Sequence, residues 1–278
     1  MSRTLSADRL SATGKFASIV VTADDGASIP VTVSGDAGPF VILVHGWSCG
    51  QAFWREQMTA FAGAYRMVTL DLPGHGSAAP QRPSGRWSMG EFGADVVAVA
   101  DDLGAEDVVL VGHSMGGAVA IEAALRLRSR CRLLVGVDTF TEAAFYTARP
   151  ADEIRARRAA FEGDFSGTME GMIGAITGAA ADQGLVRWIG EAMAANDSNA
   201  ALGVLEALLA WDIAPRWREL TTPAVALNSA MLARRNELID LEGLDVVLME
   251  GVGHFPMLED PSAFNALLAD VLARPAAG

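Results

Sequence analysis

Short, continuous apolar runs separated by helix-like segments constrain the fold of this 278-residue chain most strongly. Four such runs fall in the first half of the sequence, at Phe40–Val44, Met67–Leu70, Val108–Val111 and Leu133–Val137. Runs without polar alternation are typical of strands that are buried on both faces of a sheet. Helical spacing follows two of these runs, at 89–103 and 115–127. Strands that alternate with helices form parallel βαβ units, so the pattern predicts an α/β fold with a mostly parallel sheet.

The flanking parts of the chain extend this pattern. Two β-branched runs, Ser18–Thr22 and Val31–Val33, lie on either side of Asp24-Asp25-Gly26, which is a turn signal. They predict a hairpin that adds an antiparallel edge to the sheet. Toward the C-terminus the strand and helix patterns return at 224–227, 232–241, 245–249 and 261–272.

The stretch 139–220 has a different character. It lacks strand-like runs, and Ala, Met and Glu dominate it. Helical spacing is found at Ile154–Phe161, Met169–Ile176, Leu185–Ala195 and Ala200–Trp211. We therefore predict a helical domain at 139–220 that is inserted into a core domain formed by 1–138 and 221–278.

Composition narrows the classes of partner. The chain has 34 acidic and 21 basic residues, a net charge of −13, which disfavours nucleic acid and anionic membrane surfaces. No apolar run reaches the roughly 18 residues of a membrane span, and residues 1–15 lack the apolar core of a secretion signal. The two cysteines, Cys49 and Cys131, match no disulfide framework or metal-ligand spacing. We expect a cytoplasmic monomer or homodimer without a metal or cofactor, acting on a small apolar molecule.

One motif in the sequence predicts a catalytic nucleophile. The segment Gly112-His113-Ser114-Met115-Gly116 fits G-x-S-x-G and lies between a predicted strand and a predicted helix. Such a turn is so sharp that it strains the serine backbone, and small neighbours let the chain close. The helix N-terminus favours developing negative charge at the site. Ser114 is therefore the predicted nucleophile.

A serine hydroxyl needs a base, and the chain has four histidines. His254 lies in a glycine-containing loop after the last predicted strand, where α/β sheets place function, so we predict that it is the general base. For His45 and His75 the expected role is structural hydrogen bonding in turns, although His45 is also a candidate for substrate contact. His113 precedes the nucleophile and is a second such candidate.

An oxyanion is stabilised by two backbone N–H groups. One is expected from Met115, which follows the nucleophile, and the other from the loop after the strand 40–44. That loop reads His45-Gly46-Trp47, so the Trp47 N–H is the second predicted donor.

Together these motifs resemble the α/β-hydrolase superfamily over nearly the whole chain. The matching segments are 45–47, 71–76, 112–117 and 253–256. The resemblance implies an eight-stranded, mostly parallel sheet, a helical cap after the sixth strand, and a triad of serine, histidine and acid.

The acid departs from the common pattern of this superfamily. It usually follows the seventh strand, but the chain reads Asn228-Ser229-Ala230-Met231 there, without a carboxylate. Some members instead take the acid from the end of the sixth strand. Asp138 lies at that position, and we assign it the role of orienting the His254 imidazole. The alternative role for Asp138 is an N-cap of the next helix.

The helical insertion is rich in aromatic and Met side chains, which predicts an apolar pocket wall. Phe140, Phe145 and Trp188 are the candidates there for substrate contact. Arg155, Arg157 and Arg158 are interpreted as a solvated helix face. We therefore expect an uncharged, mostly apolar acyl compound, such as an ester, a lactone or an aromatic ketone.

Three function classes remain open. The first is hydrolysis of a carboxylic ester or lactone through an acyl-enzyme on Ser114. The second is suggested by the resemblance to cofactor-independent dioxygenases of this fold, which cleave N-heteroaromatic rings of the hydroxyquinolone type with a His–Asp dyad, here His254 and Asp138. The third is ligand reception without turnover, because one fold hosts many functions. Haloalkane dehalogenation is disfavoured, since its nucleophile would be an aspartate in place of Ser114.

Overall fold

The computed structural model describes residues 16–82 and 85–274. Among them, the strands form one eight-stranded sheet in the order β1-β2-β4-β3-β5-β6-β7-β8. Their bounds are β1 Phe16–Thr22, β2 Ser28–Ser34, β3 Phe40–Val44, β4 Arg66–Leu70, β5 Val108–His113, β6 Cys131–Val137, β7 Ala224–Ser229 and β8 Asp245–Met249. The pairs β1–β2 and β2–β4 are antiparallel, and the other pairs are parallel. The predicted α/β class, parallel sheet and N-terminal hairpin edge are confirmed.

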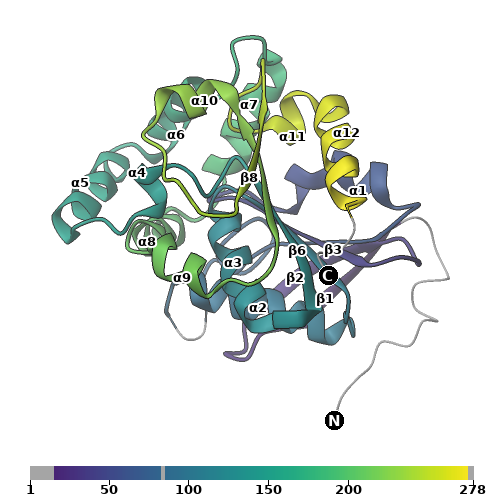
Figure 1. Ribbon diagram of the computed structural model, residues 1–278. Helices are drawn as coiled ribbons and strands as arrows, with labels where there is room; N and C mark the ends of the chain where they lie inside the picture. Colours follow the sequence, from purple (N-terminus) through teal and green to yellow (C-terminus); the bar gives the residue numbers. More distant parts are fainter. Residues whose placement is uncertain (1–15, 83–84, 275–278) are drawn as a thin grey trace.

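Helices cover both faces of this sheet. The helices of the core are α1 Arg55–Phe61, α2 Met89–Asp102, α3 Met115–Leu127, α10 Ala230–Arg235, α11 Pro256–Glu259 and α12 Pro261–Leu272, with short 3₁₀ turns η2 Gln51–Trp54 and η3 Arg128–Arg130. Figure 1 shows α2 and α3 on one side of the strands and α1, α11 and α12 on the other. The central strands are therefore buried on both faces: every residue of β3 and β5 is buried, as their continuous apolar sequences predict.

A helical segment fills the chain between β6 and β7. It contains α4 Ala143–Tyr146, α5 Ala151–Glu162, α6 Phe165–Ile176, α7 Gln183–Ala194, α8 Ser198–Leu209 and α9 Ile213–Glu219. Aspartates at the N-caps of α6, α7, α8 and α9 each accept a backbone N–H, which accounts for where these helices begin. In Figure 1, α4 to α8 gather at one end of the sheet.

The short helices α1, α4, α9 and α11 were not predicted from the sequence, and α10 is shorter than predicted. The stretch 232–241 was predicted to be helical throughout, but α10 ends at Arg235. Beyond it the backbone pairs with the loop after β6, because Leu238 and Glu142 form an antiparallel bridge. Helix α9 was not predicted, since its seven residues with Pro215 are too short for a clear apolar period.

No helix among the described residues is long and apolar enough to cross a bilayer. The N-terminal segment 1–15, which we expected not to be a secretion signal, lies outside the described residues.

Candidate active site

Ser114 lies at the turn between β5 and α3 in a strained backbone conformation. Its φ of 52° and ψ of −122° fall in a region that L-residues rarely adopt. The turn stays attached to the sheet, because the Ser114 N–H donates to the Val137 carbonyl of β6 at 3.0 Å. From the same strand end, the Thr139 hydroxyl donates to the Ser114 carbonyl at 2.8 Å. Backbone strain held by several contacts is typical of functional sites.

The glycines around Ser114 are required because a side chain at their positions would clash with the neighbouring backbone or with Thr139. A Cβ on Gly112 would lie 2.3 Å from the Gly116 carbonyl oxygen, and one on Gly116 would lie 2.4 Å from the Val44 oxygen. A Cβ on Gly117 would lie 2.3 Å from Thr139 Oγ1. Larger residues at these positions would therefore force the turn open and move Ser114 away from the end of the sheet.

His254 and Asp138 are in direct contact, although 116 positions separate them in the chain. The His254 Nδ1 is 2.5 Å from the Asp138 Oδ2. A carboxylate only accepts, so the Nδ1 carries the proton and the other ring nitrogen, Nε2, is free to accept one. Asp138 cannot swing away, because its second oxygen accepts the Ser229 N–H of β7 at 2.8 Å.

Asn228, at the end of β7, holds the loop that carries Asp138. Its side-chain oxygen accepts the Thr139 N–H, and its amide nitrogen donates to the Thr139 carbonyl and to the Thr141 hydroxyl. Thus β7, which lacks a carboxylate of its own, supplies the hydrogen bonds that position the carboxylate of β6.

The loop that carries His254 is held by a second carboxylate. Glu259 accepts the N–H groups of Gly253, Phe255 and Gly178, at 2.8, 3.1 and 2.8 Å. The His254 N–H itself donates to the Ile176 carbonyl at 2.8 Å. The loop after β8 is therefore tied to the end of α6 as well as to the sheet.

The charge of Asp138 determines the protonation of His254. Burial lowers the pKa of His254, but the hydrogen bond and the charge of Asp138 outweigh it, and Glu142 and Glu259 act in the same sense. The net pKa lies above the ordinary value of 6.5. The neighbouring His113 has a pKa well below 6.5, because of burial and the charge of His254. Only one of the two adjacent rings is thus ready to take a proton.

A cavity of about 530 Å³ opens at this end of the sheet, between the core and the helical segment. Ser114, His254 and Trp47 line it from the core. Most of the rest of its wall is apolar and comes from Phe145, Ala160, Phe161, Met172, Ala175, Ile176, Met193, Leu205, Leu208, Leu232 and Phe255. The cavity is therefore shaped for a mostly apolar molecule that reaches the serine and the imidazole.

The two residues that are predicted to supply the oxyanion donors are Met115, which follows Ser114 in the chain, and Trp47, which lines the same cavity. Met115 is the first residue of α3, so its backbone N–H has no acceptor one turn earlier in the helix. Trp47 lines the cavity, and its indole Nε1 donates to the Ala201 carbonyl of α8 at 2.7 Å. That bond fixes the loop after β3 against α8.

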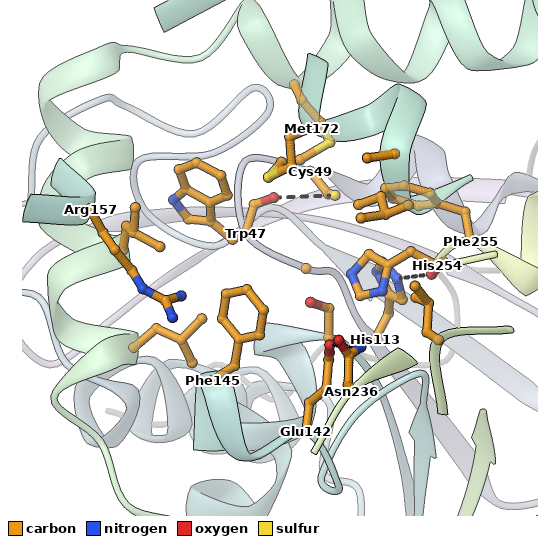
Figure 2. Close-up of a pocket in the computed structure, with 18 of the residues that line it drawn as sticks. Trp47, Cys49, His113, Glu142, Phe145, Arg157, Met172, Asn236, His254 and Phe255 are labelled. Atoms are coloured by element: carbon orange, nitrogen blue, oxygen red, sulfur yellow. Dashed lines mark hydrogen bonds between the residues drawn. The ribbon is translucent and has the colours of Figure 1, made fainter. Parts of the chain in front are cut away.

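Two of the predicted substrate contacts line the cavity. Phe145 forms part of the wall. His113 also lines it, but its Nε2 is 2.8 Å from the His254 carbonyl, so that this ring supports the loop of His254 (Figure 2).

The other three predicted contacts do not line the cavity, and this part of the prediction is corrected. His45 is fully buried, with its Nε2 accepting the Leu72 N–H and its Nδ1 bonded to the Gly46 carbonyl. Phe140 is fully buried against Trp217. Trp188 packs on Phe53 and beneath the Arg55 guanidinium. In each case local packing directs the ring away from the cavity wall. Residue type and position in the sequence did not indicate this packing.

Four polar residues of the wall were missed: Glu142, Arg157, Arg235 and Asn236. The interpretation of Arg157 as part of a solvated face is wrong, because it lines the cavity with its guanidinium 5.5 Å from the Phe145 ring centroid. A signal for it was present, since Ile154, Arg157 and Phe161 follow helical spacing of three and four residues on one face of α5. Glu142 follows the carboxyl end of β6, where ligand sites of parallel sheets lie.

The Cys49 thiol also lines the cavity, but burial strongly raises its pKa. It therefore stays protonated and does not compete as a nucleophile. Within the residues that the structure describes, no group of three or more His, Cys, Asp or Glu side chains is arranged to hold a metal ion.

Comparisons with known proteins agree with this architecture. Epoxide hydrolase B of Mycobacterium tuberculosis (strain ATCC 25618 / H37Rv) is 40% identical over 101 residues, which cover 36% of this chain and only 28% of that protein. Pimeloyl-[acyl-carrier protein] methyl ester esterase of Nitrosospira multiformis is 25% identical over 260 residues, which cover 82% of this chain and 92% of that protein.

Among solved structures, an esterase from Exiguobacterium antarcticum superposes with a TM-score of 0.79 at 20% identity, covering 93% of this chain and 100% of that one. At this identity the likeness concerns the fold. The sequence pattern described as "Alpha/beta hydrolase family" matches residues 41–267, which include all but the first residue of β3, the strands β4 to β8 and the candidate site. With this match and the observed sheet, the chain belongs to the alpha/beta hydrolase family.

Proposed function

We propose that the protein is a serine hydrolase that cleaves a carboxylic ester or lactone through an acyl-enzyme on Ser114. The observation that carries the proposal is the 2.5 Å contact between His254 Nδ1 and Asp138 Oδ2, in a cavity whose wall includes Ser114. This contact leaves Nε2 as the ring nitrogen that is available to take a proton from a serine nucleophile.

The reaction then has two halves. His254 Nε2 takes the proton of the Ser114 hydroxyl as its oxygen attacks the carbonyl carbon. The imidazolium returns that proton to the leaving alkoxide, and the acyl group remains on Ser114. Water repeats the sequence, with His254 taking its proton and Ser114 leaving as the hydroxyl. Asp138 stabilises the imidazolium in both halves.

The negative charge that develops on the carbonyl oxygen is assigned to the N–H groups of Met115 and Trp47. Both are backbone groups held before the substrate arrives, one by α3 and the other by the indole bond to Ala201. Donors that need no reorganisation during the reaction contribute most to such catalysis.

The nature of the nucleophile separates esters from epoxides, although an epoxide hydrolase is among the similar proteins. Attack of a serine oxygen on an epoxide would leave an ether on Ser114, which water does not cleave under mild conditions. Attack on an ester or lactone leaves an acyl ester, which the same base can hydrolyse. The acyl or aromatic part would occupy the apolar wall formed by α5 to α8.

A fluorophosphonate probe tests this proposal directly. We expect one equivalent to attach to Ser114, detected as a mass increase of the peptide that contains it, with loss of nitrophenyl ester hydrolysis. The Ser114→Ala variant should remain folded and unlabelled. A folded wild-type protein that neither reacts with the probe nor cleaves any nitrophenyl ester would rule the proposal out.

Because Asp138 lies at the end of β6, we keep a second candidate function. In a cofactor-independent dioxygenase, His254 with Asp138 would deprotonate an N-heteroaromatic substrate such as a hydroxyquinolone, and Ser114 would only bind it. Oxygen consumption with such a substrate, retained in Ser114→Ala and lost in His254→Ala, would favour this reaction over ester hydrolysis.

A further inference from the structure

One part of the cavity wall takes no direct part in the steps of the proposed reaction, although it holds a carboxyl and a carboxamide. Glu142 comes from the loop after β6, and Asn236 directly follows α10. The Asn236 amide nitrogen donates to the Glu142 Oε1. In Figure 2 the two side chains lie next to each other and point into the space between Phe145 and His113.

The backbone holds this pair in place. The Ala143 N–H donates to the Glu237 carbonyl at 3.0 Å, and the Ile239 N–H donates to the Thr141 carbonyl at 2.7 Å. These two bonds flank the bridge between Glu142 and Leu238. The carboxyl and the amide are therefore positioned by the chain itself, before any ligand binds, as a recognition site requires.

Two acceptor oxygens of this pair take no part in the hydrogen bond between the side chains. Glu142 Oε2 and Asn236 Oδ1 receive no hydrogen bond from any residue in 16–82 or 85–274. Both are oxygens, and both belong to residues of the cavity wall. A polar group enclosed with a ligand is costly unless it is satisfied, so the ligand that fits this wall brings a donor.

The surrounding charges favour a neutral donor. Two arginines, Arg157 and Arg235, line the same cavity as the one carboxyl of Glu142. Burial raises the pKa of Glu142, and the charge of Arg157 acts against that rise. An ammonium group would gain one carboxylate but meet two like charges in the same wall, whereas a hydroxyl or an amide N–H would meet no like charge. Glu142 and Asn236 line the same cavity as Ser114 and His254, so a molecule that reaches the serine can also present a donor to this pair.

We propose that Glu142 and Asn236 select substrates that carry a hydroxyl or amide N–H within a few bonds of the ester carbonyl. This inference rests on the proposed ester hydrolysis for its kinetic test, and it adds a substrate class to that function. A site built to hydrogen-bond a substrate donor discriminates strongly against the analogue that lacks it, because the buried acceptors are then left unpaired.

Three nitrophenyl esters that differ at one position test it: 3-hydroxybutyrate, 3-methoxybutyrate and 3-aminobutyrate. We expect kcat/KM for the hydroxy ester to exceed that for the methoxy ester by about tenfold or more in the wild type. Glu142→Ala should bring the ratio close to 1, and Asn236→Ala should lower it partly. The ratio cancels any common effect of Glu142 on His254, which acts on all three esters alike.

Glu237→Ala is the matched control, because it removes the same type of charge from an exposed position in the same paired segment. It should keep the wild-type ratio. A ratio near 1 in the wild type, an unchanged ratio in Glu142→Ala, or a preference for the amino ester would each overturn the inference.

A binding measurement distinguishes a failure of this inference from a failure of the proposed function. If the wild type cleaves none of the esters, ester hydrolysis fails, and calorimetry with ethyl 3-hydroxybutyrate and ethyl 3-methoxybutyrate on Ser114→Ala still decides the selectivity. Tighter binding of the hydroxy ester that Glu142→Ala abolishes would support it. Equal binding of the two would overturn it.

Discussion

At the scale of single residues, Asp138 decides which nitrogen of His254 is free to act as a base. An asparagine in its place would offer an N–H as well as an oxygen to Nδ1 and would stabilise the wrong tautomer. We predict that Asp138→Asn lowers kcat for a nitrophenyl ester by about 10⁴-fold. Thermal unfolding should show that the variant is folded. Activity within about tenfold of the wild type would instead mean that Glu142 supports the imidazole.

The raised pKa of His254 predicts the pH dependence of the wild type. The imidazole acts as a base only when it is neutral, so kcat/KM should rise with pH, with a midpoint above 6.5. Glu142 is one of the groups that raise this pKa, so Glu142→Ala should shift the midpoint downward. A pH-rate profile of both proteins checks this, and a midpoint below 6.5 in the wild type would contradict it.

The strained backbone of Ser114 predicts a gain in stability when function is removed. Glycine relieves a φ of 52°, so Ser114→Gly should raise the free energy of unfolding by about 1 kcal/mol while abolishing activity. Arg128, exposed at the other end of α3, has nearly the same φ and ψ, 55° and −122°. Arg128→Gly is therefore the control, and it should stabilise the protein with activity intact. Urea unfolding measures both, and a destabilised Ser114→Gly would argue against strain.

At the scale of elements, Glu259 joins the loop after β8 to the junction between α6 and α7. Replacing it by glutamine places an NH₂ group among three N–H donors. We predict that Glu259→Gln lowers the free energy of unfolding by about 2 kcal/mol and lowers kcat more than it changes KM. Glu250→Gln removes an exposed partner of Arg234 and should change neither. Urea unfolding and ester kinetics provide the comparison, and an unchanged kcat would mean that the loop keeps its place without Glu259.

The elements could be predicted from the sequence to different extents. Central strands such as β3 and β5 were evident, because burial on both faces demands a continuous apolar run. The end of α10 was not, since pairing between 237–239 and 141–143 is a tertiary contact that overrides local helical spacing. The juxtaposition of Asp138 with His254 followed from the strand ends. The directions of Phe140 and Trp188 did not, because loops and helix faces are oriented by packing partners distant in the chain.

At the scale of the whole molecule, the buried Glu122 of α3 fastens the helical segment to the core. Its Oε1 accepts the Trp211 indole N–H at 3.0 Å and faces the Arg216 Nε at 2.9 Å, while its Oε2 accepts from Arg126. We predict that Glu122→Ala lowers the free energy of unfolding by about 2 kcal/mol, since these donors lose a charged acceptor. Urea unfolding measures it, and a loss no larger than that of Glu250→Gln would show that the contact contributes little.

The Glu122 carboxylate also predicts how the free energy of unfolding changes at acid pH. Burial raises the pKa of Glu122, but Trp211, Arg126 and Arg216 outweigh burial and hold the pKa below its ordinary value of 4.5. Its stabilisation is therefore present above pH 4.5 and is lost as the pH falls through the lower pKa of the folded state. Urea midpoints measured from pH 3 to 7 should fall less steeply at the acid end in Glu122→Gln than in the wild type. Parallel curves would exclude this contribution.

The tie between His254 and the end of α6 has a consequence for how the enzyme admits its substrate. The His254 N–H bonds to Ile176, and Glu259 bonds to Gly178 on one side and to Gly253 on the other. Lifting the α6–α7 junction would break these bonds and free the loop that carries His254. A substrate that entered on that side would therefore be attacked only after the junction had returned and the His254 loop had regained its place.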